Sequence, residues 1–162
     1  MSEARIPVQI GELKVAGPGA VLYTVGLGSC VAIALYDRAL RIGGLAHAML
    51  PDPSNGRRHT PAGRFATTAV PALVEMMREA GADPMRLTAR LAGGSSMFEA
   101  LLNDQGRRLG SRNVEAAREA LARLGTAIGA EDVGGSHGRS VYLRTADGSV
   151  TVTSVMLPDV SL

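Results

Sequence analysis

The fold is decided by residues 24–50, which read TVGLGSC VAIALYDRAL RIGGLAHAML and hold the single cysteine of the chain, Cys30. The run from Val31 to Tyr36 is apolar throughout, which is typical of a strand buried on both faces. The run from Ile42 to Leu50 predicts the returning strand of a hairpin. Between them, Asp37 to Leu40 predicts a four-residue turn, because Asp is favoured at the first position of a turn.

The turn length decides which residues of the two strands face each other. With a four-residue turn, Tyr36 faces Arg41. Cys30 then lies opposite His47, and both side chains point to the same face of the hairpin. Directly opposed Cβ atoms lie about 5 Å apart, so the thiol would reach the imidazole. A turn of three or five residues would move the two side chains to opposite faces.

A cysteine beside a histidine is typical of thiol catalysis, because the imidazole can take the proton of the nucleophile. A free thiol titrates near ~8.5 and is mostly protonated at neutral pH. Thr24 is the candidate third group, which would hold the tautomer of His47. The glycine-containing turn, with Gly28 and Ser29, could present backbone N–H groups to a developing oxyanion.

The structural alternative is that Cys30 is a small buried apolar residue and that His47 is a hydrogen-bonded core histidine. Of the other two histidines, His59 is expected on a loop surface and His137 facing solvent. These residues are too dispersed for a metal-site pattern. We therefore expect neither a metal nor a cofactor.

Outside the hairpin, the pattern predicts strands and two main helices that pack on one side of them, an α+β fold. The first predicted helix spans residues 65–80, with Pro71 inside. The second begins at a cap, Ser111 or Asn113, and ends at Gly125. The predicted strands are a short edge strand within 6–15, strands at 20–25, 86–91 and 126–133, and a hairpin of 140–145 with 150–156 around Asp147-Gly148. A long polar loop is expected at 51–63, a flexible one at 93–96, and 97–102 is ambiguous.

The composition bounds the kind of protein. The chain has 162 residues, 46% of them hydrophobic, which is enough for one globular domain. A net charge of +2 and 3% aromatic residues argue against a nucleic-acid-binding protein. A single cysteine cannot form an internal disulfide, and no apolar run is long enough for a membrane span. We therefore expect a cytoplasmic protein without membrane insertion.

Several separated motifs resemble the CheD family of chemoreceptor glutamine deamidases. They are Thr24–Ala32, a Tyr-Asp turn, Gly43–Pro51, Gly93–Met97, Leu109–Asn113 and Glu131–Gly135 with Gly138-Arg139. The resemblance covers roughly residues 20–157. It divides the chain into an N-terminal segment, 1–19, with its candidate edge strand, and a deamidase domain, 20–162.

The resemblance implies a three-layer α/β/β fold with mostly antiparallel or mixed strands, and a site of Cys30, His47 and Thr24. It implies that the thiol attacks the side-chain carboxamide of a glutamine on a chemoreceptor helix. Ammonia would leave from a thioester, and water would then release glutamate. It also implies a CheC-type phosphatase as a partner. Two departures concern partner binding: Phe65-Ala66-Thr67 after Arg64, where Tyr and Asp are usual, and Ser111 in place of an acidic residue.

Two other functions remain open at this stage. One is a non-catalytic interaction module that binds chemoreceptor or a CheC-type phosphatase. The other is a methylesterase that hydrolyses receptor glutamyl methyl esters at the same site, because the acyl-enzyme chemistry is shared.

Overall fold

The predicted hairpin is the centre of the fold. Its strands β4 (Val31–Asp37) and β5 (Ile42–Ala48) are antiparallel, and every residue of both is buried. Apolar side chains alternate between two core layers, one on each face of the hairpin. The computed structural model describes residues 2–53, 61–96 and 104–162. Both faces are covered in this structure, which explains why these strands read as continuous apolar runs.

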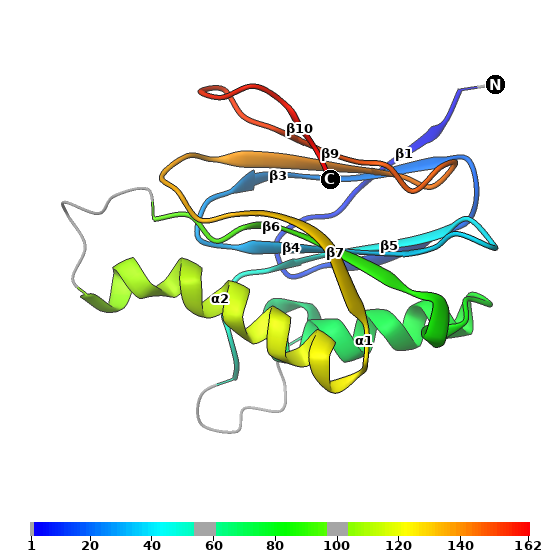
Figure 1. Ribbon diagram of the computed structural model, residues 1–162, viewed down its shortest axis with the longest axis horizontal. Helices are drawn as coiled ribbons and strands as arrows, with labels where there is room; N and C mark the ends of the chain where they lie inside the picture. Colours follow the sequence, from blue (N-terminus) through cyan, green and yellow to red (C-terminus); the bar gives the residue numbers. More distant parts are fainter. Residues whose placement is uncertain (1, 54–60, 97–103) are drawn as a thin grey trace.

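Two five-stranded sheets lie face to face (Figure 1). The inner sheet has the order β2-β5-β4-β6-β7, with β2 (Leu13–Ala16), β6 (Thr88–Gly93) and β7 (Ala127–Val133) beside the hairpin. The outer sheet has the order β1-β3-β8-β9-β10, made of β1 (Ala4–Pro7), β3 (Ala20–Leu27), β8 (Arg139–Arg144), β9 (Val150–Thr153) and β10 (Val160–Ser161). Neighbouring strands are antiparallel except β1–β3 and β6–β7, so both sheets are mixed.

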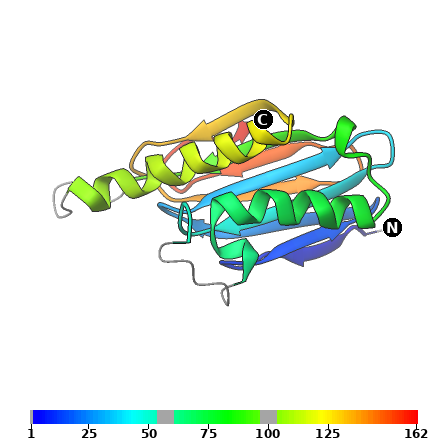
Figure 2. The same ribbon diagram turned by 90° about the horizontal axis from the view of Figure 1, so that it is seen from below.

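The two main helices form the third layer. α1 (Ala66–Glu79) and α2 (Asp104–Arg123) cover the face of the inner sheet that is turned away from the outer sheet (Figures 1 and 2). Short 3₁₀ turns, η2 (Ala62–Arg64) and η3 (Pro84–Arg86), flank α1. α2 is the crossover between the parallel strands β6 and β7. The predicted three-layer α+β fold is confirmed. In the described part of the chain, no helix has the length and hydropathy needed to cross a membrane.

Two element predictions differ from the structure. α2 begins at Asp104, so Ser111 and Asn113 lie inside the helix and neither caps it. The N-terminal segment contains two strands instead of one, and they belong to different sheets. Gly11, at φ 81°, turns the chain between them. The ambiguous stretch 97–102 and most of the predicted loop 51–63 fall on residues outside the described ranges.

The register of the central hairpin is shifted by two residues from the prediction. Ala32, not Cys30, lies opposite His47, and Asp37 pairs with Ile42. The physical reason is the Asp37 carboxylate, which accepts the amide N–H groups at positions 39 and 40, so that Asp37 closes the strand and the turn follows it. A shift of two preserves the faces. The side chains at positions 30, 32 and 47 therefore belong to the same face, as expected.

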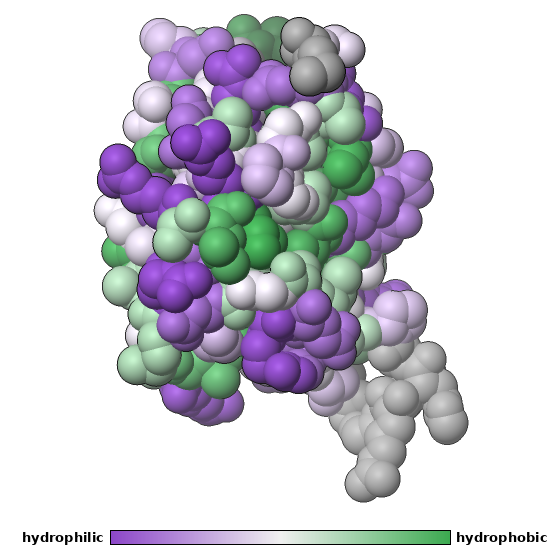
Figure 3. Space-filling view, turned by 90° about the vertical axis from the view of Figure 1, so that its right-hand side faces the viewer, coloured by the Kyte–Doolittle hydropathy of each residue, from purple (hydrophilic) through white to green (hydrophobic). Residues whose placement is uncertain are grey.

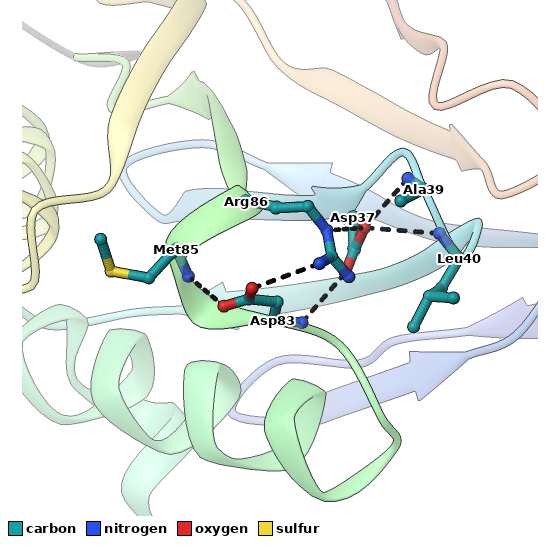
Figure 4. Close-up of polar contacts among 6 residues, drawn as sticks. All are labelled: Asp37, Ala39, Leu40, Asp83, Met85 and Arg86. Atoms are coloured by element: carbon teal, nitrogen blue, oxygen red, sulfur yellow. Dashed lines mark hydrogen bonds and ion pairs between the residues drawn. The ribbon is translucent and has the colours of Figure 1, made fainter.

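Asp37 also ties the turn to the rest of the inner layer (Figure 4). Its buried carboxylate accepts two hydrogen bonds from Arg86, at 2.8 and 3.2 Å, and one from the Asp83 amide at 3.0 Å. Burial alone would raise the pKa of Asp37. The Arg86 guanidinium and the amide donors lower the pKa by more than this, so that it lies below its ordinary value. The carboxylate therefore holds the turn in one geometry.

The molecule seen from the end of this turn has a largely polar surface around a small apolar area (Figure 3). Leu40 of the turn and Met85 of η3 are exposed large apolar side chains. The cysteine lies at the other end of β4. The two ends can therefore be altered independently.

The glycine pair of β5 lets the layers approach the hairpin closely. A Cβ atom on Gly43 would lie 2.9 Å from Cγ2 of Thr145, the residue directly after β8 of the outer sheet. A Cβ atom on Gly44 would lie 2.8 Å from the sulfur of Met77 on α1. Both spaces are too small for a side chain. The pair therefore fixes the spacing of all three layers around the strand that carries His47.

Candidate active site

Cys30 lies in the segment Gly28–Cys30, which leads from β3 of the outer sheet into β4 of the inner sheet. Its side chain is half-buried and packs against the core layer between the two sheets. The thiol is thus at the end of the sandwich, neither deep in the core nor fully in solvent.

The end of β6 holds this segment through its carbonyl groups. The amide of Gly94 donates to the carbonyl of Cys30 at 2.8 Å, and the amide of Ser95 donates to that of Gly28 at 2.9 Å. Gly93 has φ 113°, and a Cβ atom there would collide with the Cys30 carbonyl oxygen. Only glycine fits at this contact. The glycine pair at 93–94, expected as a flexible loop, is a tight support for the cysteine.

Asn113 is a site residue that the sequence analysis missed. Its buried side-chain amide donates to the carbonyl of Ser29 at 2.8 Å and to that of Met49 at 3.1 Å. It therefore ties the residue before the cysteine to the strand end that follows His47. A signal was present in the sequence: Asn113 and Ala117 fall on the same face of the helix, and an amide on an apolar face needs buried partners.

A second buried network, centred on Arg139 of β8, holds Ser95 in the segment that follows β6. Arg139, which is 3% exposed, donates to Oγ of Ser95 at 2.7 Å and to Asp132 at 3.2 Å. Oγ of Ser95 in turn donates to the carbonyl of His137 at 2.7 Å. His137 is half-buried, and its backbone enters this network. His59 lies outside the described residues.

His47 is fully buried between the two sheets. Its backbone pairs on the β2 side, where its amide donates to Glu12 and its carbonyl accepts from Gly11. The odd-numbered residues of β5, including Leu45, face the outer sheet. The imidazole therefore points at β3, which carries Thr24.

Thr24 contacts the imidazole directly. Its Oγ1 lies 2.7 Å from Nδ1 of His47 and 2.6 Å from the carbonyl oxygen of Val8. A carbonyl can only accept, so the single hydroxyl proton goes to Val8, and Thr24 must accept from Nδ1–H. The hydrogen-bond network thus assigns His47 as the Nδ1–H tautomer, which leaves a lone pair on Nε2.

The structure brings Thr24 and His47 into contact but does not join Cys30 to them by a hydrogen bond. Nε2 of His47 is buried and has no partner among the described residues. Cys30 lies two residues before Ala32, the residue opposite His47, on the same face. Such diagonal neighbours are separated by roughly 7–8 Å between Cα atoms. Catalytic hydrogen bonds are often long in unliganded enzymes and shorten when substrate binds.

Burial keeps both groups neutral. It lowers the pKa of His47 to about 4 and raises the pKa of the Cys30 thiol. A thiolate–imidazolium pair is therefore disfavoured at rest, in contrast to a cysteine with a depressed pKa. A neutral imidazole with a free lone pair can still act as a general base when the thiol attacks.

The predicted oxyanion residues Gly28 and Ser29 lie beside the cysteine. Their carbonyls are engaged by Ser95 and Asn113. Their own amide N–H groups form no hydrogen bond with the residues that the structure describes. These amides are therefore available to a bound carbonyl oxygen.

Comparison with known proteins gives consistent matches. Residues 49–154 match the family described as "CheD chemotactic sensory transduction". A protein of Geobacter metallireducens named "Probable chemoreceptor glutamine deamidase CheD 2" is 48% identical over 156 residues, covering 94% of this chain and 95% of its own. A protein of Archaeoglobus fulgidus named "Probable chemoreceptor glutamine deamidase CheD" is 48% identical over 149 residues, covering 92% of each.

Solved structures resemble the chain only weakly. The hypothetical protein YfiH of Bacillus licheniformis aligns over 82% of this chain and 60% of its own, with 17% identity and a TM-score of 0.46. The chain thus spans less than two thirds of that protein, and a likeness this weak says nothing of function.

Proposed function

Since this chain belongs to the CheD family, we propose that it deamidates glutamine side chains of chemoreceptors to glutamate, with Cys30 as the nucleophile. The relatives named as chemoreceptor glutamine deamidases support the reaction and the substrate class. Their names say nothing of the residues that perform it. The assignment of roles rests on the geometry around His47.

In the first half-reaction, Cys30 attacks the side-chain carboxamide carbon of a receptor glutamine. As the S–C bond forms, the thiol proton passes to Nε2 of His47, and the resulting imidazolium keeps its Nδ1–H bond to Thr24. The amide N–H groups of Gly28 and Ser29 bind the carbonyl oxygen as it gains charge. The C–N bond then breaks, and the leaving nitrogen takes the proton from Nε2, so that ammonia departs and a thioester remains.

In the second half-reaction, water attacks the thioester carbon. His47 takes a proton from the water through Nε2 and returns it to the sulfur as the C–S bond breaks. Glutamate and the free thiol are the products. Nε2 of His47 thus takes part in four proton transfers: it accepts from the thiol, donates to the leaving nitrogen, accepts from water and donates to the sulfur.

One observation carries this proposal: Nε2 of His47 is buried and has no hydrogen-bond partner among the residues that the structure describes. A buried polar atom without a partner costs roughly 1–3 kcal/mol. A purely structural histidine would be expected to use both ring nitrogens. Here Nδ1 is bound by Thr24, and Nε2 is left free on the face that Cys30 shares.

The test is deamidation of a purified chemoreceptor cytoplasmic fragment, followed by mass spectrometry of its glutamine-containing peptides. Each converted site gains one mass unit. We expect conversion by the wild-type chain, none by Cys30→Ala, and wild-type rates for Met85→Ser, which changes an exposed side chain at the opposite end. Equal conversion by Cys30→Ala would reject the thiol mechanism.

The same assay separates the alternatives. Receptor that binds both wild type and Cys30→Ala but is converted by neither would indicate a non-catalytic interaction module. Release of methanol from methylated receptor, without amide loss, would indicate a methylesterase. We further propose, from the family resemblance, that a CheC-type phosphatase is a partner and that the reaction takes place in the cytoplasm. Co-purification of the two chains would test the first point.

A further inference from the structure

Residues Val8–Glu12 connect β1 in the outer sheet to β2 in the inner sheet. This crossover links the edge strands of the two sheets, β1 beside β3 and β2 beside β5. It is therefore adjacent to Thr24 on β3 and to the proposed base, His47, on β5.

The crossover is hydrogen-bonded to both strands. On the outer sheet, the amide of Val8 donates to the carbonyl of Tyr23 at 2.7 Å. On the inner sheet, the amide of Gly11 donates to the carbonyl of His47 at 2.8 Å, and the amide of His47 donates to the carbonyl of Glu12 at 3.2 Å. One short segment thus binds both the N–H and the carbonyl of His47.

The crossover also fixes the side chains. The Val8 carbonyl takes the only proton of the Thr24 hydroxyl, at 2.6 Å. Both residues are 2% exposed, so bulk water does not compete for that carbonyl. We propose that the Val8–Glu12 crossover is a positioning element for the catalytic base, and that the Val8 carbonyl selects the Nδ1–H tautomer of His47 by orienting Thr24.

The reason lies in the balance between the two neutral tautomers. In water, the Nε2–H form of histidine is the more populated one. In that form Nε2 already carries a proton, so it cannot accept the proton of the thiol. If Val8 did not hold the hydroxyl proton, Thr24 could rotate and donate to Nδ1, which would permit the unproductive form. The carbonyl removes this option. Its consequence for the reaction rate rests on the proposed function, but the tautomer itself does not.

The chain offers a direct way to alter this carbonyl. Cys30 is the only cysteine, so a synthetic thioester of residues 1–29 can be ligated to an expressed 30–162 fragment that begins with Cys30, and the full chain refolded. An ester in place of the Val8–Gln9 amide weakens the Val8 carbonyl as an acceptor. All three histidines lie in the expressed part and can be labelled with ¹⁵N.

A matched control lies in the same synthetic segment. The Gln9 carbonyl accepts the amide of Glu12 at 2.9 Å. An ester in place of the Gln9–Ile10 amide therefore weakens a neighbouring carbonyl of the same crossover, one that does not accept the Thr24 hydroxyl. The Val8 ester also removes the amide of Gln9, which donates to Glu12 Oε2 at 2.8 Å. Glu12→Ala controls for that loss.

The measurement is long-range ¹H–¹⁵N correlation NMR of the histidine rings, with His47 assigned by its absence in His47→Gln. We expect the Nδ1–H form in the all-amide chain, in the Gln9 ester and in Glu12→Ala. In the Val8 ester, the ratio of Nδ1–H to Nε2–H should fall about three- to tenfold, and kcat should fall in proportion to the population of the Nδ1–H form, with KM unchanged. An Nε2–H form in the all-amide chain, or an unchanged ratio in the Val8 ester, would overturn the proposal.

Refolding of the ester is not essential to the test. In the expressed Thr24→Val chain, the hydroxyl that transmits the effect is missing, so the Nε2–H form should gain population, and Thr24→Ser should restore Nδ1–H. Persistence of Nδ1–H in Thr24→Val would also overturn the proposal. A chain that shows the expected tautomers but converts no receptor would leave the positioning intact and reject the proposed function.

Discussion

Oγ1 of Thr24 lies 2.7 Å from Nδ1 of His47, although the two residues belong to different sheets. The contact crosses the core layer between the sheets, where both side chains are at most 2% exposed. Because both ends of the contact are buried, its loss cannot be repaired by solvent. The orientation of the imidazole therefore depends on the packing of one sheet on the other.

Replacement of Thr24 by valine tests this contact by kinetics. Thr24→Val conserves shape but leaves Nδ1 and the Val8 carbonyl without a partner, which costs roughly 1–3 kcal/mol per buried group. We expect kcat for receptor deamidation to fall about 10- to 100-fold with little change in KM, and Thr24→Ser to recover most of the loss. A Thr24→Val enzyme with unchanged kcat would contradict the role of Thr24.

The reactivity of Cys30 should follow a raised pKa. Burial raises the pKa of the thiol above its ordinary value and lowers the pKa of His47, so the resting pair is neutral. The rate of alkylation by iodoacetamide, measured by mass spectrometry, should keep rising above pH 9 and show no reactive plateau near neutrality. His47→Gln should leave this profile almost unchanged. A plateau at neutral pH that disappears in His47→Gln would instead indicate a thiolate–imidazolium pair.

The burial of His47 should make stability depend on pH. Its pKa falls from 6.5 in the unfolded chain to about 4 in the folded one. Between these values the unfolded state binds a proton that the folded state does not, so stability is lost as pH falls through this window. The free energy of unfolding in urea should decrease by about 3 kcal/mol from pH 7 to pH 4.

The variant His47→Gln should lack this part of the pH dependence. A further loss should appear below pH 3.8, where Asp37 binds a proton in the unfolded chain but not in the folded chain, in which its pKa is lowered. An equal loss between pH 7 and pH 4 in wild type and His47→Gln would contradict the assignment to His47.

Asn113 should matter for both stability and turnover. Asn113→Ala leaves the carbonyls of Ser29 and Met49 without their buried donor. We expect a loss of about 1–3 kcal/mol in the free energy of unfolding. We also expect a lower kcat, because the segment before Cys30 loses its anchor to α2. Glu119→Ala changes an exposed position on the same helix and should alter neither quantity.

Two glycines with similar φ angles allow the cost of backbone strain to be distinguished from the cost of a steric clash with Cys30. Gly93 has φ 113° and Gly81 has φ 105°, so alanine is strained at both. A Cβ atom on Gly81 meets nothing within 4 Å, whereas one on Gly93 collides with the carbonyl of Cys30. Gly81→Ala should cost about 1 kcal/mol and keep full activity.

Gly93→Ala should be destabilised more than Gly81→Ala and should lose deamidation even at temperatures where it stays folded. Melting curves and receptor conversion on the same preparations would check both points. Equal effects of the two substitutions would mean that the contact between Gly93 and Cys30 does not position the thiol.

The local pattern of the chain was sufficient for most of the elements. Continuous apolar runs predicted β4 and β5, helical periodicity predicted α1, and Asp147-Gly148 predicted the turn between β8 and β9, all of which are confirmed. The start of α2 was wrong. Asn113 was interpreted as a cap from its residue type alone, whereas its amide is used by carbonyl groups far away in the sequence.

The face shared by Cys30 and His47 also followed from the sequence, because parity along a strand survives a register error of two residues. The register itself did not follow. It depends on the Asp37 carboxylate, which is held by Arg86 from another part of the chain. A side chain that bonds across 49 residues leaves no local signal.

Thus most of the strands, the two main helices and the face on which the candidate nucleophile and base lie could be predicted from the sequence, because these depend on the period of neighbouring residues. The packing of distant segments decided the contact between Thr24 and His47, the lack of a partner for Nε2 among the described residues, and the neutral state of the thiol. These depend on burial between two sheets and on a carbonyl from the N-terminal crossover. Both arise only when distant segments pack together.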